Sequence, residues 1–354
     1  MNNDKYVGLD VHQASTVAVV INAQGKCVME SIIETKGNTL TDFILGLRGT
    51  LHVTLEEGTQ SAWLYDLLHP LVAELVVCDP RHNKLAAGGN KGDKIDAHKL
   101  AHRLRLGELK PIYKGEAGLR PLKVLVASYE NLVSDTTRVR NRIKAIYRSR
   151  GIGCGGREVY HPSRRAEYLA QLTEAGLRRR VELLYQQLDA LTPLRREAQK
   201  AMLRESRKQR AHQLLQQVPA IGPIRAAQLV ATVATPYRFR TKRQFWPYCG
   251  LAVVTHSSAD YRFVEGKVAK RAKPGQTRGL NHNHNHRLKA VFKGAAQEAL
   301  KREPFKSYYQ GLVSQGIKPE LARVSVARKL AAIALKVWKS GEEFRAEEVN
   351  KQAR

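Results

Sequence analysis

The feature that most restricts the fold of this chain is an aspartate inside an apolar strand pattern. Asp10 belongs to the segment Tyr6–Val11, whose residues are otherwise mostly apolar and predict a buried β-strand. A carboxylate on such a strand costs free energy unless something cationic meets it. We therefore expect the fold to bring a cation to Asp10.

The first region of the chain alternates strand patterns with amphipathic helix patterns. Three strands joined by hairpins are expected first, at Tyr6–Val11, at Thr16–Ile21 and from about Lys26. A helix, a strand, a helix and a strand follow, at Thr39–Leu47, His52–Leu55, Gln60–Val72 and Glu74–Cys78. The order β-β-β-α-β-α-β predicts an α/β domain over residues 1–116.

Three more acids join Asp10 as candidate metal ligands. Glu56 ends a later strand, which in a ribonuclease-H-like arrangement lies beside the first, so the two carboxylates converge. Asp93 and Asp96 are three residues apart at a helix start and project from one face. Four such carboxylates suit two divalent cations bound through oxygen. Paired cations about 4 Å apart promote phosphodiester cleavage.

Two of these acids leave an alternative open. Asp93 at a helix start is by itself as well explained as a cap or as a partner of the helix dipole. Glu57 competes with Glu56, because side chains alternate along a strand and only one of the two can face the metal side. The sequence favours Glu56 and leaves Glu57 as the alternative.

The charge of the chain indicates a nucleic-acid partner. There are 60 Lys and Arg residues against 32 Asp and Glu, a formal net charge of +28 over 354 residues. So large an excess is unfavourable in a compact protein without an acidic partner. The alternative is a basic, solubilising surface of the ribosomal-protein kind, which seldom accompanies a set of converging acids.

Several other classes of protein are disfavoured. The four cysteines are too widely spaced for a zinc knuckle or a redox pair, and we expect buried, reduced thiols. The N-terminus lacks a basic region followed by an apolar core, and no apolar run reaches the roughly 18 residues that cross a bilayer. The expected location is the cytoplasm, with no membrane partner and with association to the nucleoid when DNA is bound.

The rest of the chain is predicted to be mostly helical. Residues 117–211 hold long, Arg-rich helix patterns at Val124–Arg148 and Arg164–Leu191, which indicate a coiled-coil-like arm. The glycine-rich segment Gly151–Gly156 is expected to form the turn between them. Residues 212–354 predict a mostly α domain with final helices near Arg287–Lys301 and Pro319–Trp338.

Two segments of this last region are candidates for contact with phosphates. In Val218–Arg225, Gly222 lies in a short turn between helix patterns and Arg225 follows it, as in a helix-hairpin-helix. Free N–H groups at a helix start can hold a phosphate, although an ordinary turn between helices fits too. Downstream is a basic stretch, expected to be a mobile loop, with Lys267, Lys270, Arg271, Lys273 and Arg278.

Three alternating histidines, His282, His284 and His286, invite assignment as a metal site. If the segment is helical, residues two apart point in different directions, which argues against a shared metal. We expect instead a polar helix start that contacts nucleic acid.

The ordered motifs resemble one known family, the DEDD insertion-sequence transposases, which have a RuvC-like N-terminal domain and a C-terminal domain with a nucleophilic serine. The resemblance covers nearly the whole chain, through Gly8–Asp10, Leu55–Glu56, Lys91–Ala97, Pro219–Pro223 and Phe245–Leu251. It implies that Asp10, Glu56, Asp93 and Asp96 form a tetrad that binds Mg²⁺ or Mn²⁺.

The resemblance also implies a serine nucleophile shortly after the Gly250-Leu251 marker. This position falls on Ser258, with Ser257 as the alternative, because Ala259 stands where many relatives have glycine. From the residues alone, two loop hydroxyls satisfying local backbone groups would be the simpler explanation. A serine needs a base or a metal to become nucleophilic, so the resemblance implies activation by metal chemistry from a tetrad, which another subunit could supply.

The partners implied by the resemblance are donor and target DNA, a non-coding guide RNA (bridge RNA), and further copies of the chain in a dimer or tetramer. A guide RNA would explain why so basic a protein has no recognisable base-reading module. The expected function is DNA transposition by cutting and rejoining strands. The alternatives are a RuvC-like nuclease that uses the tetrad and water, and a non-catalytic RNA- or DNA-binding protein.

Overall fold

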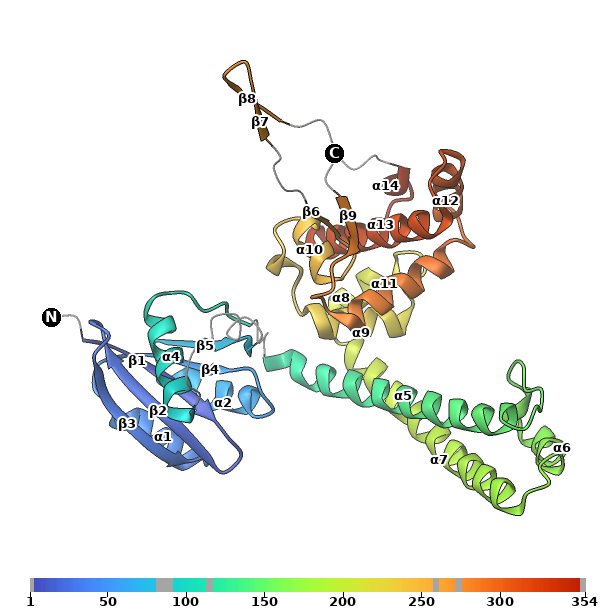
Figure 1. Cartoon of the computed structure of the whole chain (residues 1–354), viewed down its shortest axis with the longest axis horizontal. Helices are drawn as coiled ribbons and strands as arrows, with labels where there is room; N and C mark the ends of the chain where they lie inside the picture. Colours follow the sequence, from blue (N-terminus) through green and yellow to red (C-terminus); the bar gives the residue numbers. More distant parts are fainter. Residues whose placement is uncertain (1–2, 81–91, 113–116, 257–260, 271–275, 351–354) are drawn as a thin grey trace. The chain divides into compact units, whose positions relative to one another are not determined.

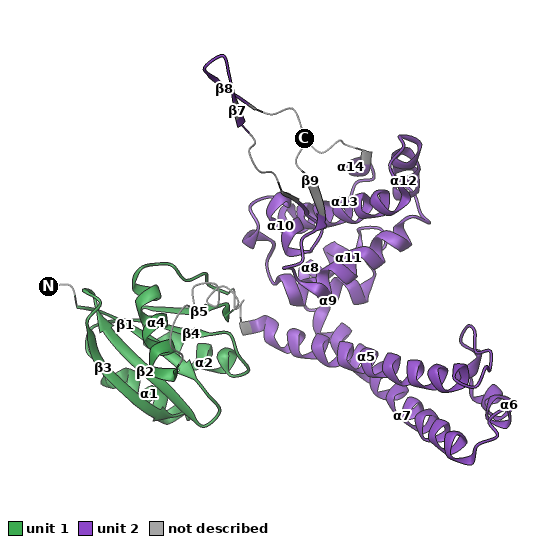
Figure 2. Cartoon of the chain, in the orientation of Figure 1, with its two compact units in different colours: residues 1–115 green, residues 116–354 purple. Residues whose placement is uncertain are grey.

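The computed structural model describes residues 3–80, 92–112, 117–256, 261–270 and 276–350 (Figure 1). The chain forms two compact units, residues 1–115 and residues 116–354 (Figure 2). The boundary predicted near residue 211 lies inside the second unit, so a separate arm and C-terminal domain stay a prediction. None of the described helices is long and apolar enough to cross a membrane.

The first unit is built on a mixed five-stranded sheet with β1 at its centre. The strands are β1 (Asp4–Val11), β2 (Ser15–Asn22), β3 (Cys27–Glu34), β4 (Thr50–Glu56) and β5 (Glu74–Cys78). Their order in the sheet is β3-β2-β1-β4-β5. The strands β1, β2 and β3 pair antiparallel, whereas β4 runs parallel to both β1 and β5. The predicted ribonuclease-H-like α/β domain is confirmed.

Helices cover both faces of this sheet. On one face α1 (Gly37–Gly46) and α2 (Ser61–Leu68) pack on the side chains of Val7, Leu9 and Leu55. On the other face α4 (Asp93–Arg105) packs on β2. The helix predicted over Gln60–Val72 ends early, because Pro70 has no N–H for the helix interior, and a 3-10 turn, η1 (His69–Leu71), follows instead.

One glycine allows α4 to lie directly on the central strand. A Cβ atom on Gly8 would overlap the carbonyl oxygen of Ala97 and would lie 2.6 Å from the amide nitrogen of Ala101. No side chain fits between β1 and the helix at this point, so the backbones of the two elements are in contact. The N-terminus of α4 is thereby held beside the end of β1, where Asp10 lies.

The second unit begins with a long antiparallel helix pair, α5 (Arg120–Arg148) and α7 (Ala175–Ser206), which Figure 1 shows in green as a projecting arm. Gly151 and Gly156 have positive φ in the turn after α5, as the glycine-rich segment predicted. The predicted helix Arg164–Leu191 is divided into α6 (Arg165–Ala170) and α7, because Leu172 turns inward and is buried at the tip of the arm. Short 3-10 turns, η2 (Ala117–Leu119), η3 (Glu158–Tyr160) and η4 (Pro162–Arg164), complete it.

The remaining helices surround one apolar core that includes Phe245, Phe292 and Leu330. They are α8 (Arg210–Gln216), α9 (Pro223–Val233), η5 (Pro236–Arg238), α10 (Lys242–Tyr248), α11 (His286–Ala299), α12 (Phe305–Ser314), α13 (Pro319–Ser340) and α14 (Glu347–Asn350). The two helices predicted near Arg287–Lys301 and Pro319–Trp338 are confirmed as α11 and α13.

Two short antiparallel strand pairs accompany these helices. They are β6 (Val253–His256) with β9 (Gln276–Leu280), and β7 (Tyr261–Val264) with β8 (Lys267–Lys270). Lys267–Lys270 and Gln276–Leu280 are therefore strands where a loop was expected, because each pairs with a neighbouring strand, whereas residues 271–275 of the same stretch lie outside the described residues.

All four cysteines are free, and Cys78, Cys154 and Cys249 are buried. Cys27 is exposed instead of buried, because it begins the edge strand β3.

The close contact at Gly8 leads to a stability prediction. Gly8→Ala should lower the free energy of unfolding by about 1–3 kcal/mol, because the new methyl group meets the backbone of α4 rather than a flexible side chain. Gly46→Ala in α1 is the matched control, since a Cβ atom there meets nothing within 4 Å. Urea unfolding of both variants measures the effect. Equal stability of the two variants would contradict the close packing of α4 on β1.

Candidate metal-dependent active site

Asp10 lies near the end of the central strand and faces the side of the sheet that α4 covers. Leu9 points into the core beneath α1 and α2, so alternation along β1 turns Asp10 toward the opposite face. Its side chain is 25% exposed. This half-buried carboxylate is the one that the apolar strand pattern indicated.

The first turn of α4 supplies a second carboxylate to the same place. Asp93 is the first residue of α4, and the imidazole of His12 lies between it and Asp10. Nε2 of His12 is 3.3 Å from an Asp10 oxygen and 3.5 Å from an Asp93 oxygen. One potential ligand atom from each of the three residues lies within 4.8 Å of the others, and no second group of this kind occurs among the residues described.

The electrostatics of this cluster favour a cation. Burial raises the pKa of the Asp10 carboxyl, the neighbouring His12 lowers it in part, and the negative charges of Asp93 and Asp96 raise it further. The carboxylates are therefore held together against their mutual repulsion. A divalent cation bound by their oxygens would remove that repulsion, and hard oxygen ligands are those that Mg²⁺ and Mn²⁺ prefer. The residues present fit such an ion.

Asp96 lies one turn further along the same helix start. Its side chain is 51% exposed, with an oxygen 3.8 Å from Nζ of Lys99. Its charge acts on Asp10, so it belongs to the same electrostatic group. It is not one of the three residues whose ligand atoms converge within 4.8 Å.

Glu56 reaches the site from the neighbouring strand. Leu55 of β4 pairs with Leu9 of β1, so Glu56, the last residue of β4, comes beside Asp10. Both acids line one cavity of about 640 Å³. Because paired residues of neighbouring strands point the same way, Glu56 shares the face of Asp10. Glu57 lines the cavity as well, but lies beyond the strand, where its N–H donates to the Cys78 carbonyl over 2.9 Å.

Sequence reasoning missed His12. The signal was available, because His12 follows Asp10 by two residues and residues two apart on a strand point to the same face.

The candidates in the second unit are placed only in part. Ser257, Ser258, Arg271 and Lys273 lie outside the described residues, as do the side chains of Lys270 and Arg278. Gly222 is the N-cap of α9, in a turn after α8 like that of a helix-hairpin-helix. The guanidinium of Arg225 donates to the Ala220 carbonyl over 2.8 Å, so it stabilises this turn. Lys267 begins the strand β8.

The histidine run does not form a candidate metal group in the part of the chain that the structure describes. The rings of His284 and His286 lie 4.5 Å apart, and Asn285 caps α11 by accepting a hydrogen bond from the N–H of Leu288. The expected helix start is confirmed at His286, the first residue of α11, whereas His282 and His284 precede the helix in a bend. Contact of this helix start with nucleic acid stays a prediction.

Comparison with known proteins identifies the class. Residues 7–149 match the model of DEDD transposases of the IS110 type, described as "Transposase", and residues 212–310 match "Transposase IS116/IS110/IS902 family". A protein of Sinorhizobium fredii (strain NBRC 101917 / NGR234), "Putative transposase y4pF/y4sB", is 25% identical over 284 residues, which cover 80% of this chain and 71% of that protein.

These matches, together with the fold and the acidic cluster, define a transposase that cuts and rejoins DNA and uses divalent metal. The chain belongs to the IS110 family of DEDD transposases.

The register of β4 predicts which of two adjacent glutamates binds metal. Glu56→Gln should weaken Mn²⁺ binding by at least about tenfold, because it removes a charged oxygen ligand on the Asp10 face. Glu57→Gln, its neighbour in the same cavity, should change the affinity little. Titration calorimetry with Mn²⁺ compares the two variants. A larger loss in Glu57→Gln would show that the register deduced at the end of β4 is wrong.

Proposed function

We propose that Asp10, Glu56, Asp93 and Asp96 hold the divalent cations, Mg²⁺ or Mn²⁺, with which this transposase cuts DNA strands. The main support for the proposal is that the carboxylates of Asp10 and Asp93 both lie next to the imidazole of His12. The negative charge of Asp96 also raises the pKa of Asp10. Glu56 lines the same cavity as Asp10. Bound metal would activate the attacking oxygen and stabilise the leaving oxygen of the scissile phosphate.

The protein's own residues prepare this site in three ways. The contact at Gly8 fixes the N-terminus of α4, and with it Asp93, beside the end of β1. An N–H at Nε2 of His12 can donate to either carboxylate and orient both. The cavity beside Asp10 and Glu56 gives a phosphodiester access to the carboxylates from the sheet edge.

A serine in the second unit completes the proposed reaction. Ser258, with Ser257 as the alternative, attacks the phosphorus atom of a DNA strand. The hydroxyl proton passes to water, an Oγ–P bond forms, and the bond from phosphorus to a sugar oxygen breaks as that oxygen takes up a proton from water. The link between serine and DNA keeps a phosphoester bond. The hydroxyl group of another strand end can therefore attack the same phosphorus, release the serine and join the two strands. The support is the family membership and the sequence position after Leu251.

The proposed partners are donor and target DNA, a non-coding bridge RNA and further copies of the chain in a dimer or tetramer. A net charge of +28 favours contact with several nucleic-acid strands at once. Base pairing by the RNA would choose the DNA sequence while basic side chains hold the backbones. Cleavage of labelled DNA with and without this RNA tests whether the RNA selects the DNA sequence.

Loss of one tetrad charge should separate cleavage from binding. Asp10→Asn and Asp96→Asn should each lower the rate of strand cleavage by at least about a hundredfold, because metal coordination weakens, while affinity for nucleic acid stays nearly the same. Asp42→Asn, an exposed aspartate of α1, makes the same charge change away from the site and should cleave normally. A gel assay of labelled DNA with Mg²⁺ measures the rates. Normal cleavage by both tetrad variants would remove the tetrad from the mechanism.

A serine variant distinguishes the recombinase from a plain nuclease. Ser258→Ala should eliminate covalent protein–DNA adducts and recombination, because alanine lacks the attacking oxygen, while metal and RNA binding survive. Ser257→Ala is the matched control and should form adducts. Mass spectrometry of the trapped adduct locates the modified residue. If both variants still recombine DNA, water is the nucleophile and the covalent mechanism is wrong.

A further inference from the structure

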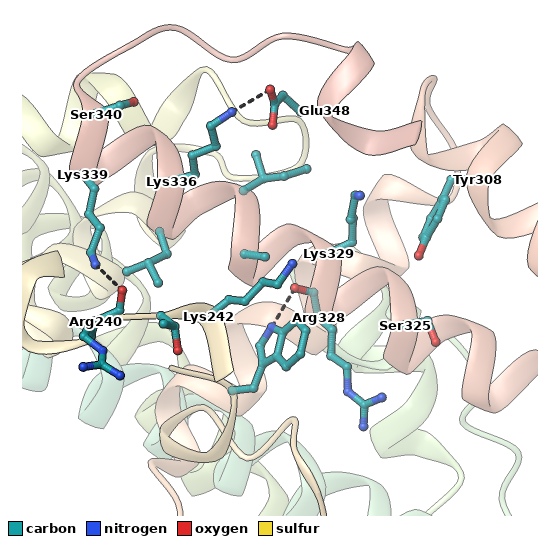
Figure 3. A pocket seen from close by; sticks show the side chains of 15 residues that line it. Arg240, Lys242, Tyr308, Ser325, Arg328, Lys329, Lys336, Lys339, Ser340 and Glu348 are labelled. Carbon is teal, nitrogen blue, oxygen red and sulfur yellow. Dashed lines mark hydrogen bonds and ion pairs between the residues drawn. The ribbon is translucent and has the colours of Figure 1, made fainter. Parts of the chain in front are cut away.

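A basic pocket in the second unit has no role in the chemistry proposed so far. It has a volume of about 690 Å³ and is bounded by side chains from α10, α12, α13 and α14, together with residues just before α10 (Figure 3). Its cationic lining consists of Arg240, Lys242, Arg328, Lys329, Lys336 and Lys339. Among the lining residues Glu348 is the one acid. The pocket therefore has a strong excess of positive charge.

Neighbouring groups already hold part of this lining in place. Lys336 forms an ion pair with Glu348 at 2.6 Å. The ammonium group of Lys339 donates to the backbone carbonyls of Phe239 and Arg240. The dashed lines of Figure 3 mark the Lys336–Glu348 pair and the contact of Lys339 with Arg240, which hold these two lysines at the wall of the pocket.

Two further lysines, Lys242 and Lys329, bring like charges together in the pocket. Burial lowers the pKa of Lys329, the charge of Lys242 lowers it further, and Glu348 raises it. Like charges brought together in a partly buried place repel each other unless an anion joins them. Both lysines belong to a lining in which cationic side chains outnumber the acid Glu348, and such an excess of positive charge attracts a phosphate.

An aromatic ring lies beside the same lysines. The indole N–H of Trp246 donates to the backbone carbonyl of Arg328 over 3.0 Å, which holds the ring at the pocket wall. Nζ of Lys242 is 6.0 Å from the Trp246 ring centre, and Nζ of Lys329 is 5.8 Å from that of Tyr308. An oriented ring next to clustered cations is the arrangement with which proteins bind unpaired bases and their phosphates.

We propose that this pocket binds one unstacked nucleotide of a single nucleic-acid strand. Its base lies against Trp246 and its phosphate is held by Lys242 and Lys329. A duplex is disfavoured, because its bases are stacked and paired and cannot enter a pocket of this kind. The DNA strands of transposition and an RNA strand share this chemistry. The site needs neither the tetrad nor the serine, so it stands or fails independently of them.

Tryptophan fluorescence of the full-length protein tests the stacking step. In a Trp63→Phe and Trp338→Phe background, Trp246 is the only tryptophan that remains. Short single strands of DNA and of RNA are added separately in EDTA, and each that binds should change the Trp246 emission saturably. The strand that binds with the higher affinity is the ligand that the pocket prefers. A duplex of equal length should have little effect. The proposal is wrong if both strands bind by fluorescence anisotropy while the emission stays constant, or if the mononucleotide AMP binds as tightly as a strand.

Charge neutralisation tests the phosphate contact. Lys242→Gln with Lys329→Gln should lower affinity for the single strand about tenfold and reduce the slope of log affinity against log salt by about 1.4, or about 0.7 per lost contact. Lys293→Gln with Lys306→Gln, two exposed lysines outside the pocket, is the control with the same change in charge. Equal losses in the two pairs would overturn the proposal. If circular dichroism shows that the first double variant does not fold, the single variants Lys242→Gln and Lys306→Gln are compared instead. Their slopes of log affinity against log salt should then differ by about 0.7. EDTA removes divalent metal from both assays, so their results do not depend on whether the tetrad binds metal.

Discussion

The contact between α4 and the central strand is the constraint on which the acidic site depends. Carboxylates do not gather by themselves, and the pKa of Asp10 is raised by burial and by the charges of Asp93 and Asp96. Packing must supply the free energy that opposes this repulsion. It does so through the apolar contact of Ala97 and Ala101 with β2 and through the absence of a side chain at Gly8. The same contact therefore stabilises the domain and builds the site.

The two units divide the chemistry between them. All four acids of the proposed tetrad belong to residues 1–115, whereas both candidate serines and the basic pocket belong to residues 116–354. The proposed metal site and the proposed strand-binding pocket thus depend on separate hydrophobic cores. Damage to the pocket should leave the folding of the acidic site intact.

The sequence predicted those features that depend on local periodicity. The order of strands and helices in the first unit followed from alternation, and Asp10 was conspicuous because it interrupts an apolar strand. What the sequence could not show depends on contacts between distant residues. The division of the arm helix accompanies the burial of Leu172, and the pairing of β8 with β7 makes a strand of Lys267–Lys270, where the basic residues suggested a loop. His12 is a different case, because its spacing from Asp10 was visible and only its contact with Asp93 was not.

Anomalous diffraction from crystals of the protein grown with Mn²⁺ would test the central claim most directly. The proposed tetrad predicts two Mn²⁺ peaks, about 4 Å apart, at the end of β1, with oxygen ligands from Asp10, Glu56, Asp93 and Asp96. Absence of bound Mn²⁺ at this end of the sheet, or coordination by Glu57 in place of Glu56, would contradict the account of how the strand register and α4 assemble the site.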